Sequence, residues 1–217
     1  MFSSRWPLAG LRLRTPEVEL RWPSLSDLGA LADLAAAGVH DPDVMPFLTP
    51  WTEAPPDERA LSTIQYHWSR WASWRPSDWR LELVVARDGV VVGSQGMHGR
   101  DFAVVREVGT GSWLGRAYHG RGTGTQMRAA VLHLAFEGLR AEQAVSGAFE
   151  DNAASLGVSR KLGYRDDGVR LHAVRGRRVV ERRLRLTRDD WLAKRSVPVE
   201  IEGLEACLPM FGLAAAG

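Results

Sequence analysis

Residues 112–125 read Ser-Trp-Leu-Gly-Arg-Ala-Tyr-His-Gly-Arg-Gly-Thr-Gly-Thr, with three glycines within five residues near the end. A strand-like run precedes this stretch and an apolar pattern at helical spacing follows it, which predicts a strand joined to a helix by a glycine-rich turn. A helix N-terminus leaves backbone N–H groups unpaired and carries the positive end of the helix dipole. A turn of this kind can therefore bind phosphate oxygens.

Two common phosphate-binding motifs do not match this turn. A Walker A loop needs Gly-Lys-Ser/Thr after its spacer, and a dinucleotide-binding loop needs G-x-G-x-x-G. Both also need parallel βαβ surroundings, whereas Asp88-Gly89 between two apolar runs is a strong hairpin signal. The remaining alternative is a plain tight turn whose glycines only supply positive φ.

The chain before the turn predicts hairpins and helices. In order these are a hairpin over 11–20, a helix from Ser26-Asp27 to Gly38, a loop over 40–56, a helix over 57–74, strands over 81–85 and 90–93, and a strand over 107–114. Gly109 and Gly111 in the last strand indicate a bulge or a close backbone approach.

The chain after the turn predicts alternating elements. They are a helix over 127–138, a strand over 144–149, a helix over 152–162, and a hairpin of strands 169–174 and 179–186. The order predicts an α+β fold with a mixed, mostly antiparallel twisted sheet flanked by helices on both faces. We expect a single domain over 1–193, with a C-terminal tail over 194–217 that packs on the domain or on a partner subunit.

Several short motifs occur together in a fixed order. They are Trp113-Leu114-Gly115, His119-Gly120-Arg121-Gly122-Thr123-Gly124, Asn152-Ala153-Ala154-Ser155 and Lys161-Leu162-Gly163-Tyr164. In this order the chain resembles the GNAT superfamily of N-acetyltransferases, and within it the branch related to ribosomal-protein N-terminal acetyltransferases. The resemblance is specific over residues 107–164, and it implies a GNAT-like sheet.

The resemblance also implies a cofactor, acetyl-CoA or another acyl-CoA such as succinyl-CoA. Backbone N–H groups of 120–125 would bind the pyrophosphate, strand 113–115 would bind the pantetheine arm, Asn152 would contact that arm, and Ser155 would lie near the sulfur. The implied cofactor-binding residues are Trp113, Leu114, Gly115, His119, Gly120, Arg121, Gly122, Thr123, Gly124, Thr125, Asn152 and Ser155.

The chain departs from the family pattern at two positions. His119 stands where the family usually has Gln or Arg, which makes any side-chain role there dependent on pH. Gly109 stands where members often carry a glutamate. Glu107 lies two residues earlier and on the same strand face, because side chains alternate along a strand.

The implied reaction is direct attack of a primary amine on the thioester, with an amine of a peptide or of a small molecule as acceptor. It needs proximity, a base for the ammonium proton and a donor for the departing thiolate. Ser155 is the candidate donor and Glu107 the candidate base, with Glu82 and His98 as rivals on neighbouring strands. A catalytically silent acyl-CoA-binding or interaction module is the alternative function.

Tryptophans crowd the second predicted helix and the loop before it. Trp68 and Trp71 share a helical face, so we expect both in the core. Trp51 and Trp74 are left open between the core and a wall of the acceptor site.

The amino-acid composition limits the kinds of partner that the chain can bind. Lys and Arg number 28 against 26 Asp and Glu, and this net charge of +2 gives no argument for nucleic acid. An arginine-rich stretch over 165–188 is expected to be a solvated edge hairpin. No window is apolar enough for a membrane span. The single cysteine, Cys207, excludes an internal disulfide and fits a reducing, cytoplasmic compartment, and no cluster predicts a metal. An exposed apolar tail over 204–216 would favour a homodimer.

Overall fold

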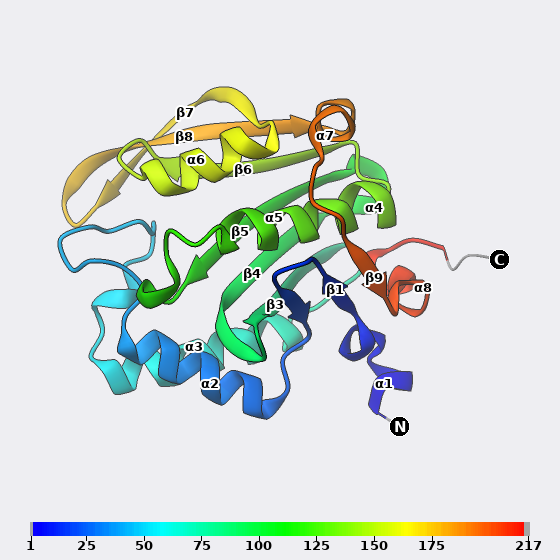
Figure 1. The fold of residues 1–217 in the computed structure, drawn as a ribbon, viewed down its shortest axis with the longest axis horizontal. Coiled ribbons are helices and arrows are strands. Elements are labelled where there is room, and N and C mark those ends of the chain that lie inside the picture. The colour runs from blue at the N-terminus through cyan, green and yellow to red at the C-terminus, as the bar shows by residue number, and fades with distance from the viewer. Residues whose placement is uncertain (1, 215–217) are drawn as a thin grey trace.

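The computed structural model describes residues 2–214, with side chains from residue 4 onward, and forms a nine-stranded sheet in the order β7-β8-β6-β5-β4-β3-β2-β1-β9 (Figure 1). The strands are β1 (Arg12–Arg14), β2 (Glu19–Arg21), β3 (Asp78–Arg87), β4 (Val90–Arg100), β5 (Glu107–Leu114), β6 (Gln143–Phe149), β7 (Arg165–Val174), β8 (Arg177–Thr187) and β9 (Glu200–Glu202). Strands β5 and β6 pair in parallel, and the other neighbours pair antiparallel.

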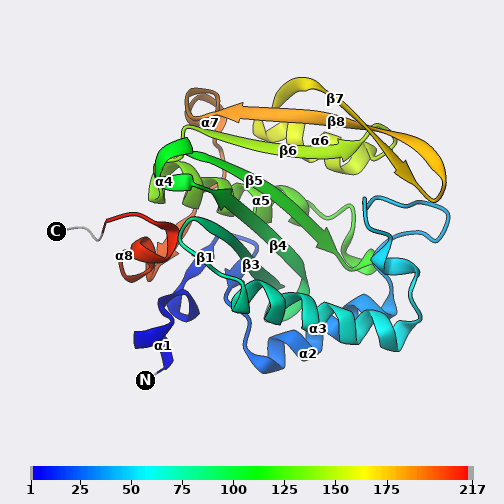
Figure 2. The ribbon, with the colours of Figure 1, turned by 180° about the vertical axis from the view of Figure 1, so that it is seen from behind.

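Helices cover both faces of this sheet. They are α1 (Phe2–Arg5), α2 (Leu25–Ala37), α3 (Pro56–Ala72), α4 (Phe102–Val105), α5 (Thr123–His133), which continues as a π-helical turn over Leu134–Gly138, α6 (Ala153–Leu162), α7 (Arg188–Lys194) and α8 (Leu204–Cys207). In Figure 1 α5 and α6 lie in front of the sheet, whereas α3 lies in front when the molecule is seen from behind in Figure 2. The predicted α+β class, with a mostly antiparallel sheet between helices, is confirmed.

Alternation along β3 shows how the two faces differ. Leu81, Leu83 and Val85 belong to the main core, which also contains the buried side of α5. Val84 packs in a smaller cluster with Leu31 of α2. Because side chains alternate, Glu82 shares the α2 side of the sheet with Val84.

Helix α2 has a complete N-terminal cap. The Ser24 hydroxyl accepts a hydrogen bond from the Asp27 N–H, and the Asp27 carboxylate accepts one from the Ser24 N–H. This reciprocal pair satisfies two donors that a helix start leaves free, so α2 begins at Leu25, before the predicted Ser26-Asp27 start. Gly38, with φ of 117°, ends the helix as predicted.

Gly29→Ala should stabilise the protein. Gly29 lies inside α2, and a Cβ added there would meet nothing within 4 Å. Alanine restricts the unfolded chain and favours a helix, so the free energy of unfolding should rise by about 0.5–1 kcal/mol. Urea titration measures this change. Gly38→Ala is the matched control, since its positive φ should make the same substitution destabilising.

Helix α3 corrects one tryptophan prediction. Its most buried side chains are Thr63 and His67, whereas Leu61 and Trp68 are 55% and 48% exposed. Helix α3 packs along α2, with the smaller Thr63 on its buried side and Trp68 turned to solvent. The core prediction for Trp68 is therefore wrong.

The other tryptophans at the end of α3 join the core. Trp71 stacks on Trp22 with ring centroids 4.9 Å apart and packs against the core. Trp74, left open by the sequence, is buried and stacks on Trp79 at 6.1 Å. The residues at the end of α3 thus belong to a cluster of packed aromatic side chains.

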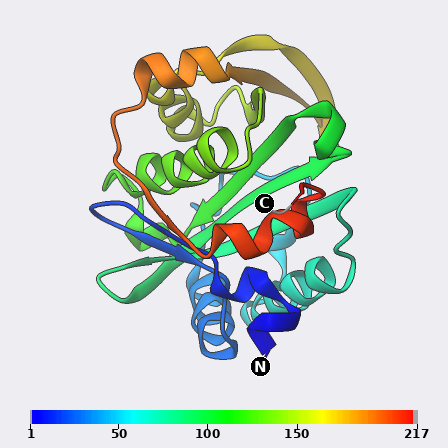
Figure 3. The ribbon, with the colours of Figure 1, turned by 90° about the vertical axis from the view of Figure 1, so that its right-hand side faces the viewer.

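The C-terminal tail adds to the same sheet. Strand β9 pairs antiparallel with β1, and Cys207 and Phe211 are fully buried in the core. Figure 3 shows the tail running from α7 down to α8, which lies close to the N-terminal helix. Since these side chains are covered within the chain, the tail gives no separate argument for the predicted homodimer. Residues 215–217 of that tail lie outside the described residues, and the domain boundary at 193 stays a prediction.

The arginine-rich hairpin is β7 and β8, with β7 at the edge of the sheet. Ion pairs join Arg182 to Asp166, and both Arg183 and Arg185 to Asp167. The hairpin's own carboxylates therefore offset part of its positive charge. Among residues 2–214, no helix is both long and apolar enough to cross a membrane.

Candidate functional site

Strands β5 and β6 part in the middle of the sheet. They pair only through Glu107 with Gln143, Val108 with Ala144, and Gly109 with Val145. Beyond Gly109, β5 continues to Leu114 on β4, while β6 continues to Phe149 on β8. Each strand then presents one edge of backbone N–H and C=O groups with no ladder partner. An extended ligand can bind these edges as an added strand would.

The glycine-rich turn lies beyond the end of β5. Gly120 and Gly122 adopt positive φ of 74° and 81°, and α5 begins at Thr123. The first backbone bond of this turn is that of the Thr125 N–H to the Gly122 carbonyl, at 2.9 Å. The N–H groups of residues 120–124 have no partner among the turn and cap bonds of the described chain. A Cβ added at either glycine would meet nothing within 4 Å, so no other part of the described chain covers the turn at these two glycines. Unpaired N–H groups at an uncovered helix start can bind phosphate oxygens.

Two side chains hold the turn in place. The Arg87 guanidinium donates to the Arg121 carbonyl and to the Thr123 hydroxyl, both at 3.1 Å. The His119 ring donates from Nε2 to the Leu114 carbonyl at 3.0 Å. His119 thus ties the turn to β5. Arg87 carries no motif, so the sequence provided no signal for its role.

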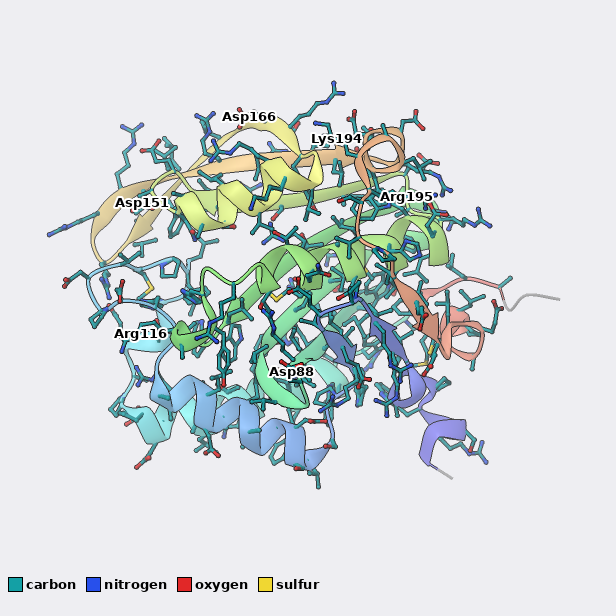
Figure 4. The ribbon with its side chains drawn as sticks, viewed as in Figure 1. Asp88, Arg116, Asp151, Asp166, Lys194 and Arg195 are labelled. Atoms are coloured by element: carbon teal, nitrogen blue, oxygen red, sulfur yellow. The ribbon has the colours of Figure 1, made fainter. Side chains whose placement is uncertain are left out.

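Asn152 and Ser155 lie at the start of α6. The Asn152 side-chain oxygen accepts the Ser155 N–H at 3.0 Å, which makes Asn152 the N-cap of the helix. The Ser155 hydroxyl has no hydrogen-bond partner among the described side chains, and it remains free to donate to a ligand. Figure 4 places Arg116, at the turn before α5, and Asp151, at the turn before α6, at the same end of the sheet.

Glycines form the floor of the α2 side of the sheet. Gly96 of β4 pairs with Glu82 on one side and with Gly111 on the other. A Cβ at Gly96 would lie 2.6 Å from Glu82 Oε2, so the carboxylate lies directly over the glycine. The ring of His98 covers Gly109 in the same way, with Nε2 2.3 Å from where a Cβ would stand.

The sequence allowed a bulge or a close approach at the β5 glycines. The ladder between β4 and β5 runs without a register shift from Gly93 with Leu114 to His98 with Gly109. The bulge alternative is therefore wrong, and at Gly109 the close neighbour is the side chain of His98 rather than the predicted backbone. A side chain there would displace the His98 ring, which is a packing reason for the glycine.

Glu82 is the most perturbed carboxyl group on this face. Tyr66 of α3 donates its hydroxyl to Glu82 Oε1 at 2.7 Å, and no ion pair reaches Glu82 from the described residues. Burial raises the pKa of Glu82 to about 7, although the Tyr66 hydrogen bond opposes the rise. Burial lowers the pKa of His98 to about 4. At neutral pH His98 is uncharged, and Glu82 is poised to exchange a proton.

Glu107 lies where β5 and β6 are still paired. It is the first residue of β5, opposite Gln143, and two residues before the last pair at Gly109. The hydrogen bond to Asp167 is the largest cause of the raised pKa of Arg185, and the charge of Glu107 adds to it. The structure thus brings Glu82 and His98, rather than Glu107, over the glycine floor.

Trp51 lies beside the strand predicted to bind pantetheine. Its ring centroid is 5.6 Å from that of Trp113 on β5 and 5.4 Å from that of Phe47. An ion pair from Glu53 to Arg175 links this loop to the tip of the β7–β8 hairpin. Between them lies a cavity of about 320 Å³ lined by Met45, Phe149, Asp151, Val174, Arg175, Arg177 and Val179. The ion pair thus holds the two sides of this cavity together.

Comparison with known families and structures agrees with this geometry. The family model described as an acetyltransferase (GNAT) domain matches residues 17–165.

Within residues 4–214, no group of three or more His, Cys, Asp or Glu side chains could hold a metal ion.

Solved structures share the fold at low sequence identity. RimJ of Mycobacterium smegmatis, solved with CoA-disulfide, is 19% identical with a TM-score of 0.69, and the match covers 86% of this chain and 95% of that one. RimL, a ribosomal L7/L12 alpha-N-protein acetyltransferase solved with coenzyme A, is 17% identical with a TM-score of 0.62, over 80% and 95% of the chains. A GCN5-related N-acetyltransferase from Brucella melitensis is 20% identical with a TM-score of 0.64, over 84% and 80%.

Proposed function

This chain belongs to the GNAT family of acetyltransferases, and from that premise we propose that it transfers an acetyl group from acetyl-CoA to a primary amine by direct attack. The observation that carries the proposal is the parting of β5 and β6 beyond Gly109, next to an open glycine turn at the start of α5. Both the enzyme class and the resemblance to the ribosomal-protein branch agree with the comparisons.

The residues present fit CoA. Free N–H groups of the turn over 120–125 would hold the pyrophosphate, and the open edge of β5 up to Gly115 would bind the pantetheine arm. Asn152 offers its remaining amide donors at the start of α6. When bound, the cofactor supplies the activated thioester. The Gly115 N–H is bonded to the Val92 carbonyl at 3.0 Å, so the strand N–H group that would polarise the thioester carbonyl is that of Leu114.

We assign the proton acceptor to Glu82. It lies over the glycine floor, it is held by Tyr66, and its pKa of about 7 suits a base at neutral pH. Glu107 stays a rival, two residues from the point where the strands part. Ser155, with its free hydroxyl at the start of α6, is the proposed donor to the departing sulfur.

The acceptor is proposed to be a peptide amine, with a small-molecule amine as the other candidate. RimL acts on an alpha-amino group of a ribosomal protein by its name, which favours a peptide here. Acetyl is the proposed acyl group, with succinyl as the variant to test. A cytoplasmic location and a homodimer remain predictions.

Thiol release tests the proposed function. Peptide and small-molecule amines are incubated separately with acetyl-CoA and with succinyl-CoA, and free CoA is read with a thiol reagent. We expect acceptor-dependent release with acetyl-CoA, confirmed by the mass of the acetylated amine. Calorimetric CoA binding without release for any amine would instead support the catalytically silent binding module.

A further inference from the structure

Arg128 is a buried cation without an anion. It lies on α5, is only 5% exposed, and forms no ion pair with any side chain of residues 4–214. One guanidinium nitrogen donates to the Ser159 hydroxyl at 2.9 Å, while Nε is buried with no partner. Burial lowers the pKa of Arg128, but an arginine remains charged in proteins.

An unpaired buried charge destabilises a folded protein, because no attraction offsets the loss of its hydration. Ser159 offers only a neutral dipole, and its own hydroxyl donates to the Ser155 carbonyl at 3.0 Å. Stability alone therefore gives no reason for a cation at this place. A negative partner that binds from outside the chain does.

The position of Arg128 indicates where that partner would lie. The Tyr164 side chain is close enough for the Arg128 charge to oppose the rise that burial causes in the Tyr164 pKa. The Tyr164 hydroxyl shares a hydrogen bond of 3.3 Å with the Thr110 hydroxyl. Thr110 is the first residue of β5 beyond its last pair with β6.

Ser146 completes this arrangement from β6. It is the first residue of that strand beyond the last pair, and its hydroxyl donates to the Thr110 carbonyl at 3.4 Å. Arg128, Ser159, Tyr164 and Thr110 thus form a buried polar cluster, with the half-buried Ser146 at its edge. The cluster lies on the α5 side of the sheet, directly where the two strands part.

We propose that the guanidinium of Arg128 is the electrostatic partner of the CoA sulfur, and that it stabilises the thiolate released when the thioester breaks. This inference rests on the proposed function, because it places CoA between the parted strands. In the reaction the amine nitrogen forms a bond to the acetyl carbon, and the electron pair of the broken C–S bond goes to sulfur. The amine proton goes to Glu82, and Arg128 transfers no proton.

The proposal predicts a lowered thiol pKa for CoA bound to the protein. Burial alone would raise a thiol pKa, whereas a cation close to the sulfur lowers it, by about one to two pH units. The thiol is titrated through its ultraviolet thiolate absorbance in the complex with CoA. The same protein with desulfo-CoA provides the reference spectrum, which removes the signals of Cys207 and the tyrosines.

Arg128→Met removes the charge and keeps an apolar chain of similar length, and Arg128→Lys keeps the charge. We expect the parent and the Lys variant to lower the bound thiol pKa relative to free CoA, and the Met variant to raise it by at least about one pH unit. Arg170→Met, at an exposed position of β7, is the matched loss of charge and should leave the bound thiol unchanged.

Three results would overturn the proposal. The first is a bound thiol in the parent with a pKa equal to or above that of free CoA, which decides the matter even if the Met variant does not fold. The second is an unchanged thiol pKa in a folded Met variant that still binds CoA. The third is a selective loss of succinyl-CoA affinity in that variant without a change in the thiol, since the cation would then serve an acyl carboxylate. Failure of the parent to bind CoA at all refutes the proposed function instead.

Discussion

Glu82→Gln is expected to lower kcat/KM for acetyl transfer by about 10²- to 10³-fold at a pH of about 8, with little change in the Kd for CoA. Glutamine keeps the size of the side chain and can still accept the Tyr66 hydrogen bond. It cannot take a proton from the attacking amine. Steady-state kinetics and calorimetry on the same preparation separate the two effects.

The pH profile gives the sharper result. In the parent, kcat/KM should rise with pH through about 7, the pKa to which burial raises Glu82, because only the carboxylate accepts a proton. This acidic limb should be absent from the Gln variant. Glu107→Gln is the matched control and should keep both the rate and the limb. If the acidic limb were lost only in Glu107→Gln, the base would instead be Glu107 of β5.

Glu82→Gln should lower activity but raise the free energy of unfolding at basic pH. The pKa of Glu82 is about 7 in the folded protein and 4.5 when unperturbed, so the folded state binds this proton more tightly. Stability from the protonated form is fully present below about 4.5 and is lost as pH rises through about 7. Above that range Glu82→Gln should unfold less readily than the parent, by on the order of 1–3 kcal/mol. Urea titrations at acidic and basic pH measure the crossover.

Gly122→Val is expected to weaken CoA binding by about 10²-fold or more. Gly122 has φ of 81° at the N-cap of α5, a conformation that a β-branched residue adopts only with strain. Relief of that strain would turn the N–H groups of the turn away from the pyrophosphate. Hydrogen bonds to charged groups contribute about 1.5–3 kcal/mol each, so the loss of one or two accounts for the expected change.

Gly176→Val is the control for strain alone. Gly176 also has positive φ, of 69°, and a Cβ there also meets nothing within 4 Å, but it lies at the tip of the β7–β8 hairpin. Gly176→Val should unfold more easily than the parent, as is also expected of Gly122→Val. Its CoA affinity should stay near that of the parent. Equal loss of CoA affinity in both variants would contradict a direct role for the turn over 120–125.

The sequence by itself determined the strand, turn and helix around 112–125. A positive φ at glycine and free N–H groups at a helix start are properties of neighbouring residues, so local sequence is enough to predict them. The same holds for the Asp88-Gly89 hairpin, where both residues have positive φ. The order of elements then predicted the mixed sheet.

Only the tertiary structure decided which charged side chains we propose for the site. Glu82 lies far from the glycine turn in sequence, and Arg128 lies near it but belongs to no motif. Their proposed roles rest on the pairing of β3 with β4 and on burial between α5 and α6. Sheet register decides which side chain lies over which glycine, and burial decides a pKa. Both depend on contacts between distant segments, as does the turn of Trp68 toward solvent on α3.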